Sequence, residues 1–367
     1  MTRTVVLGSG IVGRAAAWDL DRRGHEVTVA DLSAQDAARV GEEFGISWAQ
    51  VDVTDAGSVD AVLAGADCVV AAVPYLYGEQ LALAAIRNRC HYLDFGGNPT
   101  IVKSQLLLDV AAREAGVAVV PDCGLAPGYA NVLAAEMIAT ASGEQIDVQI
   151  RVGVLPQQPV GALNYQLAFY AGGLINEYAE PCEIIQAGVA TTVESLGRTE
   201  LLDWPGLGTL EAFSTAGGTS TMCHQYEGEV RSLEYKTIRY PGHGAVFAAL
   251  RDLGFFATEP YTAAGIAPRA MLVDLLTENL PSGGPDMTLV GVTAESASGR
   301  RELRVEDRSD RRFSSLARMT AFPTTALCDM VASGAIDFRG AAAMHSVAES
   351  GGLNVELDPL GIAPIEV

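Results

Sequence analysis

The stretch LEYKTIRYPGH, residues 233–243, combines three basic side chains with a strand-like pattern in an otherwise acidic chain. Successive side chains of a strand point to opposite faces, so Lys236 and Arg239 are expected to face different surroundings. Arg239 has the planar fork that binds a carboxylate through two hydrogen bonds. Lys236 could accept or pass on a proton if burial lowered its pKa. His243, which follows a Pro-Gly turn, could contact the same ligand.

Each of these residues also has a structural interpretation. Glu234 and Lys236 share one predicted face and could form a surface ion pair across strands. Arg239 could lie at an interface, and a histidine in a turn is commonly a surface residue. The residues alone leave these alternatives open.

The loop STAGGTST, residues 214–221, is rich in hydroxyl groups and glycine. Thr215, Gly218 and Thr219 could offer backbone N–H groups or hydroxyl oxygens to a carboxylate or an ammonium group. A flexible turn is the alternative. Asn164, together with the adjacent tyrosine, could line the same cleft. These segments place a candidate substrate site in the second half of the chain.

A dinucleotide site is predicted near the N-terminus. An apolar run at residues 3–7 is followed by G-x-G-x-x-G at 8–13, a helix to about Arg23, and a strand that stops at Asp31. Such glycines allow a tight turn and close approach of a pyrophosphate, and the acid binds the ribose hydroxyls. No arginine directly follows Asp31, so we expect NAD rather than NADP. A degenerate domain that no longer binds a nucleotide is the alternative.

Strands and helices continue to alternate as far as residue 121, which predicts a doubly wound parallel sheet. Strands are expected over 47–51, 68–73, 91–97 and 117–121, with helices over about 78–89 and 103–115. Ligands bind beyond the carboxyl ends of such strands, although an aspartate there can equally be a helix cap. The residues expected to bind the cofactor are Gly8, Ser9, Gly10, Ile11, Val12, Gly13, Asp31, Asp52, Val53, Ala72 and Pro74.

The pattern changes after residue 126. A helix to about Ala139 precedes strands expected over 146–154, 228–240 and the pair 287–296 with 301–307. Few helices separate them, which favours an α+β domain with a mixed or antiparallel sheet. We therefore expect an α/β protein. Its NAD-binding Rossmann domain covers 1–125 and is completed by a helix in the region 318–335, for which the sequence pattern runs from about 323 to 333. An α+β substrate-binding and oligomerisation domain covers 126–317.

Composition limits the functional classes. The 367 residues are 49% hydrophobic and 19% charged, with a net charge of −21. This suits a two-domain globular protein and argues against nucleic acid or an anionic membrane as partner. No apolar run is long enough for a membrane helix and no signal peptide is evident, so a cytoplasmic protein is expected. The six cysteines and five histidines show no ligand spacing, so reduced thiols and no metal are expected.

Four motifs follow the glycine fingerprint in order: DFGG at 94–97, PDCGLAPG at 121–128, LEAFSTAGGTSTM at 210–222 and LEYKTIRYPGH at 233–243. With them, most of residues 1–335 resembles the saccharopine dehydrogenase family, and within it the branch that deaminates lysine at its ε-amine. The resemblance implies NAD-dependent oxidation of a primary amine by a homodimer or homotetramer. That branch tends to have a histidine after the double glycine, where this chain has Asn98.

The implied reaction converts the ε-amine of L-lysine to 2-aminoadipate 6-semialdehyde, which cyclises to 1-piperideine-6-carboxylate, with NADH and ammonia. Arg239 would hold the α-carboxylate, while Lys236, Tyr75 or Asp94 would lie near the ε-amine as catalytic groups. A saccharopine- or carboxynorspermidine-type dehydrogenase, which joins an amine to a carbonyl compound, is the first alternative. A non-catalytic NAD-binding regulator is the second, which the intact fingerprint and the second-domain motifs disfavour.

Overall fold

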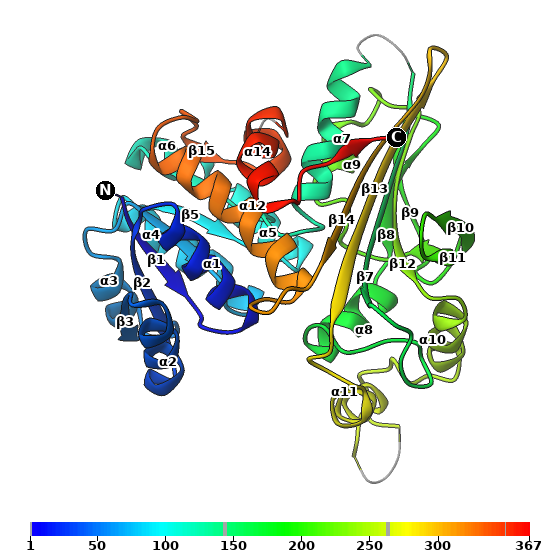
Figure 1. Ribbon diagram of the computed structural model, residues 1–367, viewed down its shortest axis with the longest axis horizontal. Coiled ribbons are helices and arrows are strands. Elements are labelled where there is room, and N and C mark those ends of the chain that lie inside the picture. Colours follow the sequence, from blue (N-terminus) through cyan, green and yellow to red (C-terminus); the bar gives the residue numbers. More distant parts are fainter. Residues whose placement is uncertain (1, 142–144, 262–264, 349) are drawn as a thin grey trace. The chain divides into compact units, whose positions relative to one another are not determined.

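The structure, a computed structural model, describes residues 2–141, 145–261, 265–348 and 350–367. The chain forms two compact units, one of Met1–Glu136 with Ala317–Ala363 and one of Met137–Leu316 with Pro364–Val367 (Figure 1). The first unit continues about ten residues past the boundary that the sequence suggested. It also takes in a longer late segment than the single expected helix.

The first unit contains a seven-stranded sheet in the order β15-β6-β5-β4-β1-β2-β3, and every pair in it is parallel. The predicted doubly wound parallel sheet is therefore confirmed. The chain leaves β1 in one direction and returns to β4 on its other side, so ligands are expected beyond the carboxyl ends of these two strands. The strands are β1 (Arg3–Leu7), β2 (Glu26–Asp31), β3 (Ser47–Gln50), β4 (Cys68–Ala71), β5 (His91–Asp94), β6 (Ala118–Val120) and β15 (Gly340–Ala341).

Helices cover both faces of this sheet, and the buried side chains of β1 point alternately toward one layer of helices and the other. Val5 and Leu7 point into a core that includes residues of α3, α4 and α6. Thr4 points the other way and meets His25, whose ring contacts Asp329 of α12. The helices of this unit are α1 (Ile11–Arg22), α2 (Ala34–Phe44), α3 (Ala56–Leu63), α4 (Gly78–Arg87), α5 (Pro99–Leu106), α6 (Asp109–Ala115), α7 (Tyr129–Thr140), α12 (Ser315–Ala332), α13 (Met344–Val347) and α14 (Ser350–Leu357), with the 3-10 turns η1 (Tyr75–Tyr77) and η2 (Asp358–Leu360).

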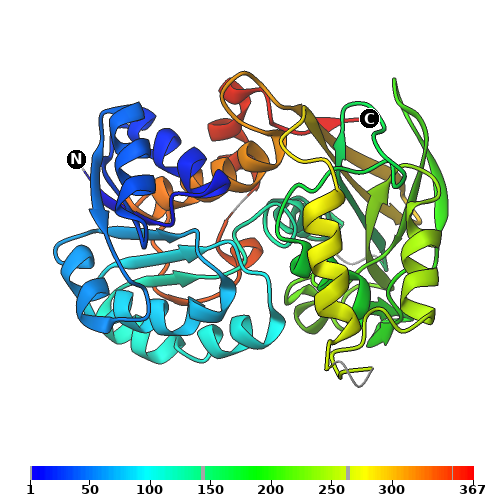
Figure 2. The same cartoon turned by 90° about the horizontal axis from the view of Figure 1, so that it is seen from below.

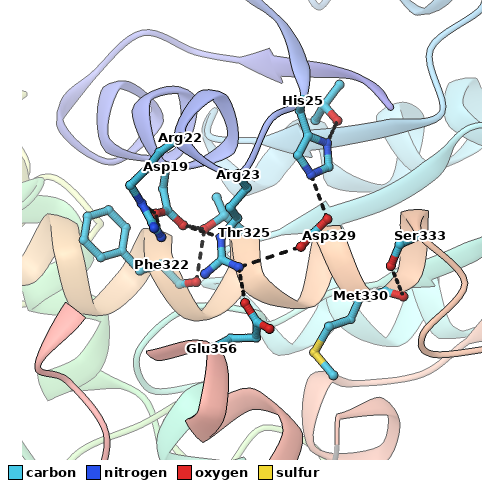
Figure 3. Close-up of polar contacts among 11 residues, drawn as sticks. Asp19, Arg22, Arg23, His25, Phe322, Thr325, Asp329, Met330, Ser333 and Glu356 are labelled. Atoms are coloured by element: carbon cyan, nitrogen blue, oxygen red, sulfur yellow. Dashed lines mark hydrogen bonds and ion pairs between the residues drawn. The ribbon is translucent and has the colours of Figure 1, made fainter. Parts of the chain in front are cut away.

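A buried carboxylate joins α1 to α12 (Figure 3). Asp19 is fully buried and accepts hydrogen bonds from Arg22, Arg23 and the Thr325 hydroxyl, at 2.7, 2.8 and 2.6 Å. Arg23 also reaches Glu356 of α14, at 2.7 Å. The late segment of the chain is thus fixed to the nucleotide-type fold by specific polar contacts as well as by apolar packing.

Two expectations about these helices need correction. The helix expected from about 323 begins at Ser315, so Pro323 lies inside it and not in its first turn. A proline interior to a helix removes one backbone hydrogen bond, and here the surrounding burial of Phe322, Ala326 and Leu327 maintains the helix. The single helix expected over 103–115 is two helices, α5 and α6.

The second unit is built on a nine-stranded mixed sheet, which confirms the predicted class. Its main order is β10-β11-β12-β7-β13-β14-β16, and β8 pairs with β12 and β9. Among the strand pairs described in this sheet, that of β12 with β7 is parallel and the others are antiparallel. The strands are β7 (Asp147–Pro156), β8 (Cys182–Gln186), β9 (Val189–Val193), β10 (Glu200–Trp204), β11 (Gly208–Ser214), β12 (Ser232–Arg239), β13 (Asp286–Ser296), β14 (Gly299–Arg308) and β16 (Ile365–Glu366).

The second unit has more helix than the sequence suggested. Besides the short α9 (Met222–Gln225) it holds α8 (Ala171–Ala179), α10 (His243–Asp252) and α11 (Pro268–Asn279, yellow in Figure 2). Leu174, Phe213, Phe247 and Leu276 bring α8, β11, α10 and α11 into one apolar core. This core positions the side chains of the candidate substrate site.

Candidate functional site

The loop between β1 and α1 has the shape that a bound pyrophosphate requires. Gly8 has φ +97°, and a Cβ atom there would lie 2.3 Å from the Ala72 carbonyl oxygen. A Cβ atom on Gly13 would lie 1.9 Å from the Gly8 oxygen, whereas Gly10 faces open space. No side chain caps the N-terminus of α1, so its N–H groups remain available to an anion. The residues present therefore fit a dinucleotide.

Asp31 lies beside this loop at the end of β2. Its carboxylate accepts hydrogen bonds from the Ser9 N–H and hydroxyl, both at 2.7 Å, and from the Ser33 N–H at 3.0 Å. Burial acts in the opposite direction, but the hydrogen bonds from Ser33 and Ser9 hold the pKa of Asp31 below its ordinary value. An ionised carboxylate thus stands where a ribose is expected.

The other predicted cofactor residues take several positions around this edge. Ile11 is 63% exposed at the start of α1 beside Val12. Asp52 is exposed and its carboxylate accepts hydrogen bonds from Thr54, which makes it a turn cap. The Val53 carbonyl accepts from Gln80. Ala72 follows β4 and packs against the glycine loop, and Pro74 precedes the 3-10 turn η1.

Two predicted catalytic residues follow β4 and β5. Asp94 is buried and receives four hydrogen bonds, from the Tyr92 hydroxyl, the Gln105 amide and the N–H groups of Gly96 and Asp122. Burial raises the pKa of Asp94, although these bonds act against the rise. Both of its oxygens are thus occupied in holding the DFGG turn.

Tyr75 differs from Asp94 because it is 39% exposed. Its ring lies against Gly97, where a Cβ atom would be 3.5 Å from the Tyr75 Cδ1. Among the described residues its hydroxyl has no hydrogen-bond partner. Tyr75 therefore presents a free functional group just beyond the end of β4.

The strand β12 separates its side chains onto two faces, as the period of two predicted. Lys236 is buried, donates to Glu200 at 2.9 Å and lies 3.6 Å from Glu234. Arg151 donates to both of these carboxylates. Although burial acts against it, these cations hold the pKa of Glu200 and Glu234 below the ordinary value. The ion pair suggested for Lys236 exists, but inside the unit and not on its surface.

Arg239 points to the other face and belongs to an aromatic cluster. It is 4% exposed, and its Nε–H donates to the Tyr178 hydroxyl at 3.1 Å. Its guanidinium carbon lies 5.1 Å from the centre of the Tyr165 ring, a cation–π arrangement. In the described part of the chain it forms no ion pair, and its Nη2 has no hydrogen-bond partner.

His243 extends this cluster and is buried, not a surface residue. Its Nε2 lies 3.0 Å from the Tyr178 hydroxyl and its Nδ1 lies 3.2 Å from the Leu163 carbonyl oxygen. Burial and the charge of Arg239 lower the pKa of His243 to about 3, so the ring is neutral. The neutral ring donates from Nδ1 to Leu163 and accepts from Tyr178, and this orients the tyrosine toward Arg239.

The remaining predicted substrate residues lie near this face of β12. The Thr215 hydroxyl is 2.7 Å from that of Thr237, and a Cβ atom on Gly218 would lie 2.3 Å from the Tyr235 ring. Thr219 makes a longer bond of 3.4 Å to the Glu183 carbonyl. Asn164 is partly buried in a left-handed conformation, between Leu163 and Tyr165 of the cluster.

The sequence reasoning missed two members of the site, Glu177 and Tyr178 on α8. The Glu177 charge acts on Arg239, Tyr178 and Tyr235, and burial raises its own pKa to about 7 although Arg239 opposes the rise. A lone acid in the apolar segment GGLINEYA was the available signal. It went unused because α8 itself was not predicted.

No cluster of metal-ligating side chains occurs among the described residues, and none of the helices described is long and apolar enough to cross a membrane. The parallel sheet with its glycine loop defines a dinucleotide-binding protein that carries a second, sheet-based domain. Residues 4–120 match the saccharopine dehydrogenase NADP binding domain, and residues 124–351 match the saccharopine dehydrogenase C-terminal domain. The chain belongs to the saccharopine dehydrogenase family.

Individual relatives are distant in sequence. The L-glutamate-forming, NADP-dependent saccharopine dehydrogenase of Pyricularia oryzae is 26% identical over 70% of this chain and 58% of that protein. The mitochondrial alpha-aminoadipic semialdehyde synthase of Mus musculus is 23% identical over 71% of this chain and 29% of that protein. The chain thus spans little more than half of the first relative and under a third of the second.

Two solved structures show the same fold. The apo saccharopine dehydrogenase (L-Glu forming) of Saccharomyces cerevisiae superposes with a TM-score of 0.83 at 20% identity, over 100% of this chain and 99% of that one. The homospermidine synthase of Legionella pneumophila in complex with NAD superposes with a TM-score of 0.73 at 13% identity, over 100% of this chain and 91% of that one.

Proposed function

We propose that this protein is an NAD-dependent dehydrogenase that oxidises the ε-amine of L-lysine to 2-aminoadipate 6-semialdehyde, releasing NADH and ammonia. The observation that carries the proposal is Arg239, a buried guanidinium without an ion-pair partner among the described residues. An unpaired buried charge is costly unless a ligand completes it. A single α-carboxylate has the charge and shape to do so.

The charges of the second unit also favour a substrate with one carboxylate over saccharopine, which has three. Arg151 and Lys236 are neutralised by Glu200 and Glu234 within the fold. Arg239 therefore remains as the buried cation available to a ligand in the described part of this unit. The named relatives nevertheless make a saccharopine-type dehydrogenase the second candidate.

NAD is the proposed cofactor because Asp31 would repel a 2′-phosphate. The nearby arginines of α1 and α2 are engaged, since Arg14 pairs with Glu43 and Arg39 pairs with Asp36. When bound, the nicotinamide ring supplies the acceptor for the hydride that leaves Cε of the substrate. The protein's own task is to bind the amino acid and to remove its proton.

The ε-ammonium must lose a proton first, because the nitrogen lone pair drives the hydride out and an amine of this kind has a pKa of about 10.4. Of the three predicted acceptors, Asp94 and Lys236 already have partners in the fold, which favours Tyr75, acting as a phenolate, as the group that takes this proton. Water then adds to the resulting imine, and ammonia leaves to give the aldehyde.

The test is NADH formation at 340 nm with NAD or NADP and a panel of amines, with and without 2-oxoglutarate. We expect lysine and NAD to give NADH without an oxo acid, with a rate that rises toward alkaline pH. NADH formation from saccharopine, and none from lysine between neutral pH and about pH 10, would replace this proposal with the saccharopine-type activity.

A further inference from the structure

Glu177 and Arg239 carry opposite charges that act on one another but form no ion pair among the described residues, and Tyr178, the residue next to Glu177, accepts a hydrogen bond from Arg239. Glu177 lies near the end of α8, and its own carbonyl accepts a hydrogen bond from the Ala216 N–H at 2.9 Å, which ties α8 to the STAGGTST loop. Its side chain is partly buried, and among the described residues it accepts no hydrogen bond and forms no ion pair.

Packing explains why the two charges stay apart. Arg239 is fixed by the Tyr178 hydroxyl, by the Ile238 carbonyl oxygen and by the Tyr165 ring. Opposite charges attract more strongly in a poorly hydrated site than in water, but a direct pair forms there only if the geometry allows good contact. Here each keeps unfilled hydrogen-bonding capacity, which a ligand that carries both charges would satisfy.

An α-amino acid has that charge arrangement. Its carboxylate and ammonium groups are attached to the same carbon, so the protein groups that bind them must also be neighbours. With the carboxylate on Arg239, the ammonium lies within reach of an acid beside Arg239. The ε-amine of lysine is at the far end of the side chain and needs a different contact.

We propose that Glu177 binds the α-ammonium group of the substrate and selects α-amino acids over other ω-amines. This assignment rests on the proposed function, in which Arg239 holds the α-carboxylate. It gives the second unit a pair of opposite charges that recognises the amino-acid head group. The raised pKa of Glu177 is consistent with a carboxyl group that lacks its partner until the substrate arrives.

Three substrates that differ by one group each test the proposal. Lysine has both head-group charges, 6-aminohexanoate lacks the α-ammonium and cadaverine lacks the carboxylate as well. Glu177→Gln should lower kcat/KM for lysine roughly tenfold to a hundredfold, since it removes a charge-assisted bond. The same substitution should change kcat/KM for 6-aminohexanoate and for cadaverine by less than about threefold, because neither has an α-ammonium group to lose this bond. Arg239→Met should lower kcat/KM for lysine and for 6-aminohexanoate but leave kcat/KM for cadaverine nearly unchanged.

Two variants separate recognition from folding. Glu177→Asp keeps the charge and should recover part of the lysine activity. Glu278→Gln changes an exposed carboxylate of α11 and should leave all three substrates unaffected. If Glu177→Gln lowers kcat/KM for lysine and for 6-aminohexanoate to the same extent, the proposal is overturned and Glu177 has only a structural role.

Calorimetric binding of L-norleucine, with NAD present, distinguishes this proposal from the reaction itself. Norleucine has the head group but no ε-amine, so its binding does not depend on turnover. Weaker binding to Glu177→Gln than to the unmodified protein supports the assignment even if lysine is not oxidised. No binding of norleucine or lysine to the unmodified protein, or equal binding to both proteins, overturns it.

Discussion

Glu177→Gln should also stabilise the second unit, by an amount that grows as the pH rises from 4.5 to about 7 and is then constant. Burial raises the pKa of this carboxyl group from 4.5 to about 7 although Arg239 acts against the rise. The fold therefore prefers the protonated form, and glutamine mimics that form at every pH. A residue suited to bind an ammonium group thus costs stability while the site is empty.

The size and sign follow from proton linkage. A pKa difference of about 2.5 units is worth roughly 3 kcal/mol, because each unit corresponds to about 1.4 kcal/mol. Below pH 4.5 the carboxyl group is protonated in both states and the cost is absent. The cost grows as the pH rises toward 7, because the unfolded chain ionises first, and it is constant above that. As the pH rises from about 5.5 to 8, the free energy of unfolding of the unmodified protein should fall by about 2 kcal/mol relative to that of the variant.

The neighbouring groups do not titrate in this interval. Tyr165, Tyr178 and Tyr235 have pKa values raised by burial, and His243, with a pKa of about 3, is neutral throughout. Arg239 remains charged, because the pKa of an arginine lies far above this range. The predicted change in stability therefore belongs to Glu177.

Urea unfolding followed by tryptophan fluorescence can measure this change in the free energy of unfolding. The chain has three tryptophans, and Trp204 of β10 is the buried one in the second unit. Trp18→Phe with Trp48→Phe leaves Trp204 as the sole reporter. Glu278→Gln in the same background removes an exposed carboxylate as a control. A Glu177→Gln effect that is equal at pH 5.5 and pH 8 would refute the reasoning.

Three further predictions address the cofactor, the first unit and assembly. Unmodified protein should turn over faster with NAD than with NADP, and Asp31→Ser should narrow that preference; equal turnover of the unmodified protein with NADP contradicts it. Asp19→Asn should lower the free energy of unfolding by about 3 kcal/mol, since it removes the buried carboxylate charge to which Arg22, Arg23 and Thr325 donate. Asp36→Asn is the control, because it breaks the exposed Arg39–Asp36 ion pair. It should lower the free energy of unfolding by less than about 0.5 kcal/mol. Light scattering at micromolar concentration should show a dimer or a dimer of dimers, a prediction that a monomer would contradict.

The parts of the site that depend on local pattern could be predicted from the sequence. Gly8, Gly13 and Asp31 lie close together in the chain, and a turn, a helix start and a strand end fix their geometry. The separation of Lys236 from Arg239 follows from the period of two in a strand. In both cases the backbone conformation alone decides where the side chains point.

The remaining contacts depend on segments that are distant in the chain. Lys236 is neutralised by Glu200 of β10, and its burial is a property of the whole sheet. Glu177 acquires its surroundings from Arg239 of β12 and from Ala216 of the loop after β11, which lie far from α8 in the sequence. The two-residue strand β15 has no signal of its own, because its pairing with β6 creates it.

The late return of the chain to the first unit has a consequence for synthesis on the ribosome. Helix α12 fills one face of the parallel sheet, yet about 180 residues of the second unit are translated between α7 and α12. Until α12 emerges, apolar surface on α1 such as Trp18, which packs on Phe322 in the finished fold, stays in water. The N-terminal part of the chain must therefore wait, incomplete, while the second unit is made. A chain cut short before residue 317 should be prone to aggregation, and a premature stop there should be far more damaging than its position near the C-terminus suggests.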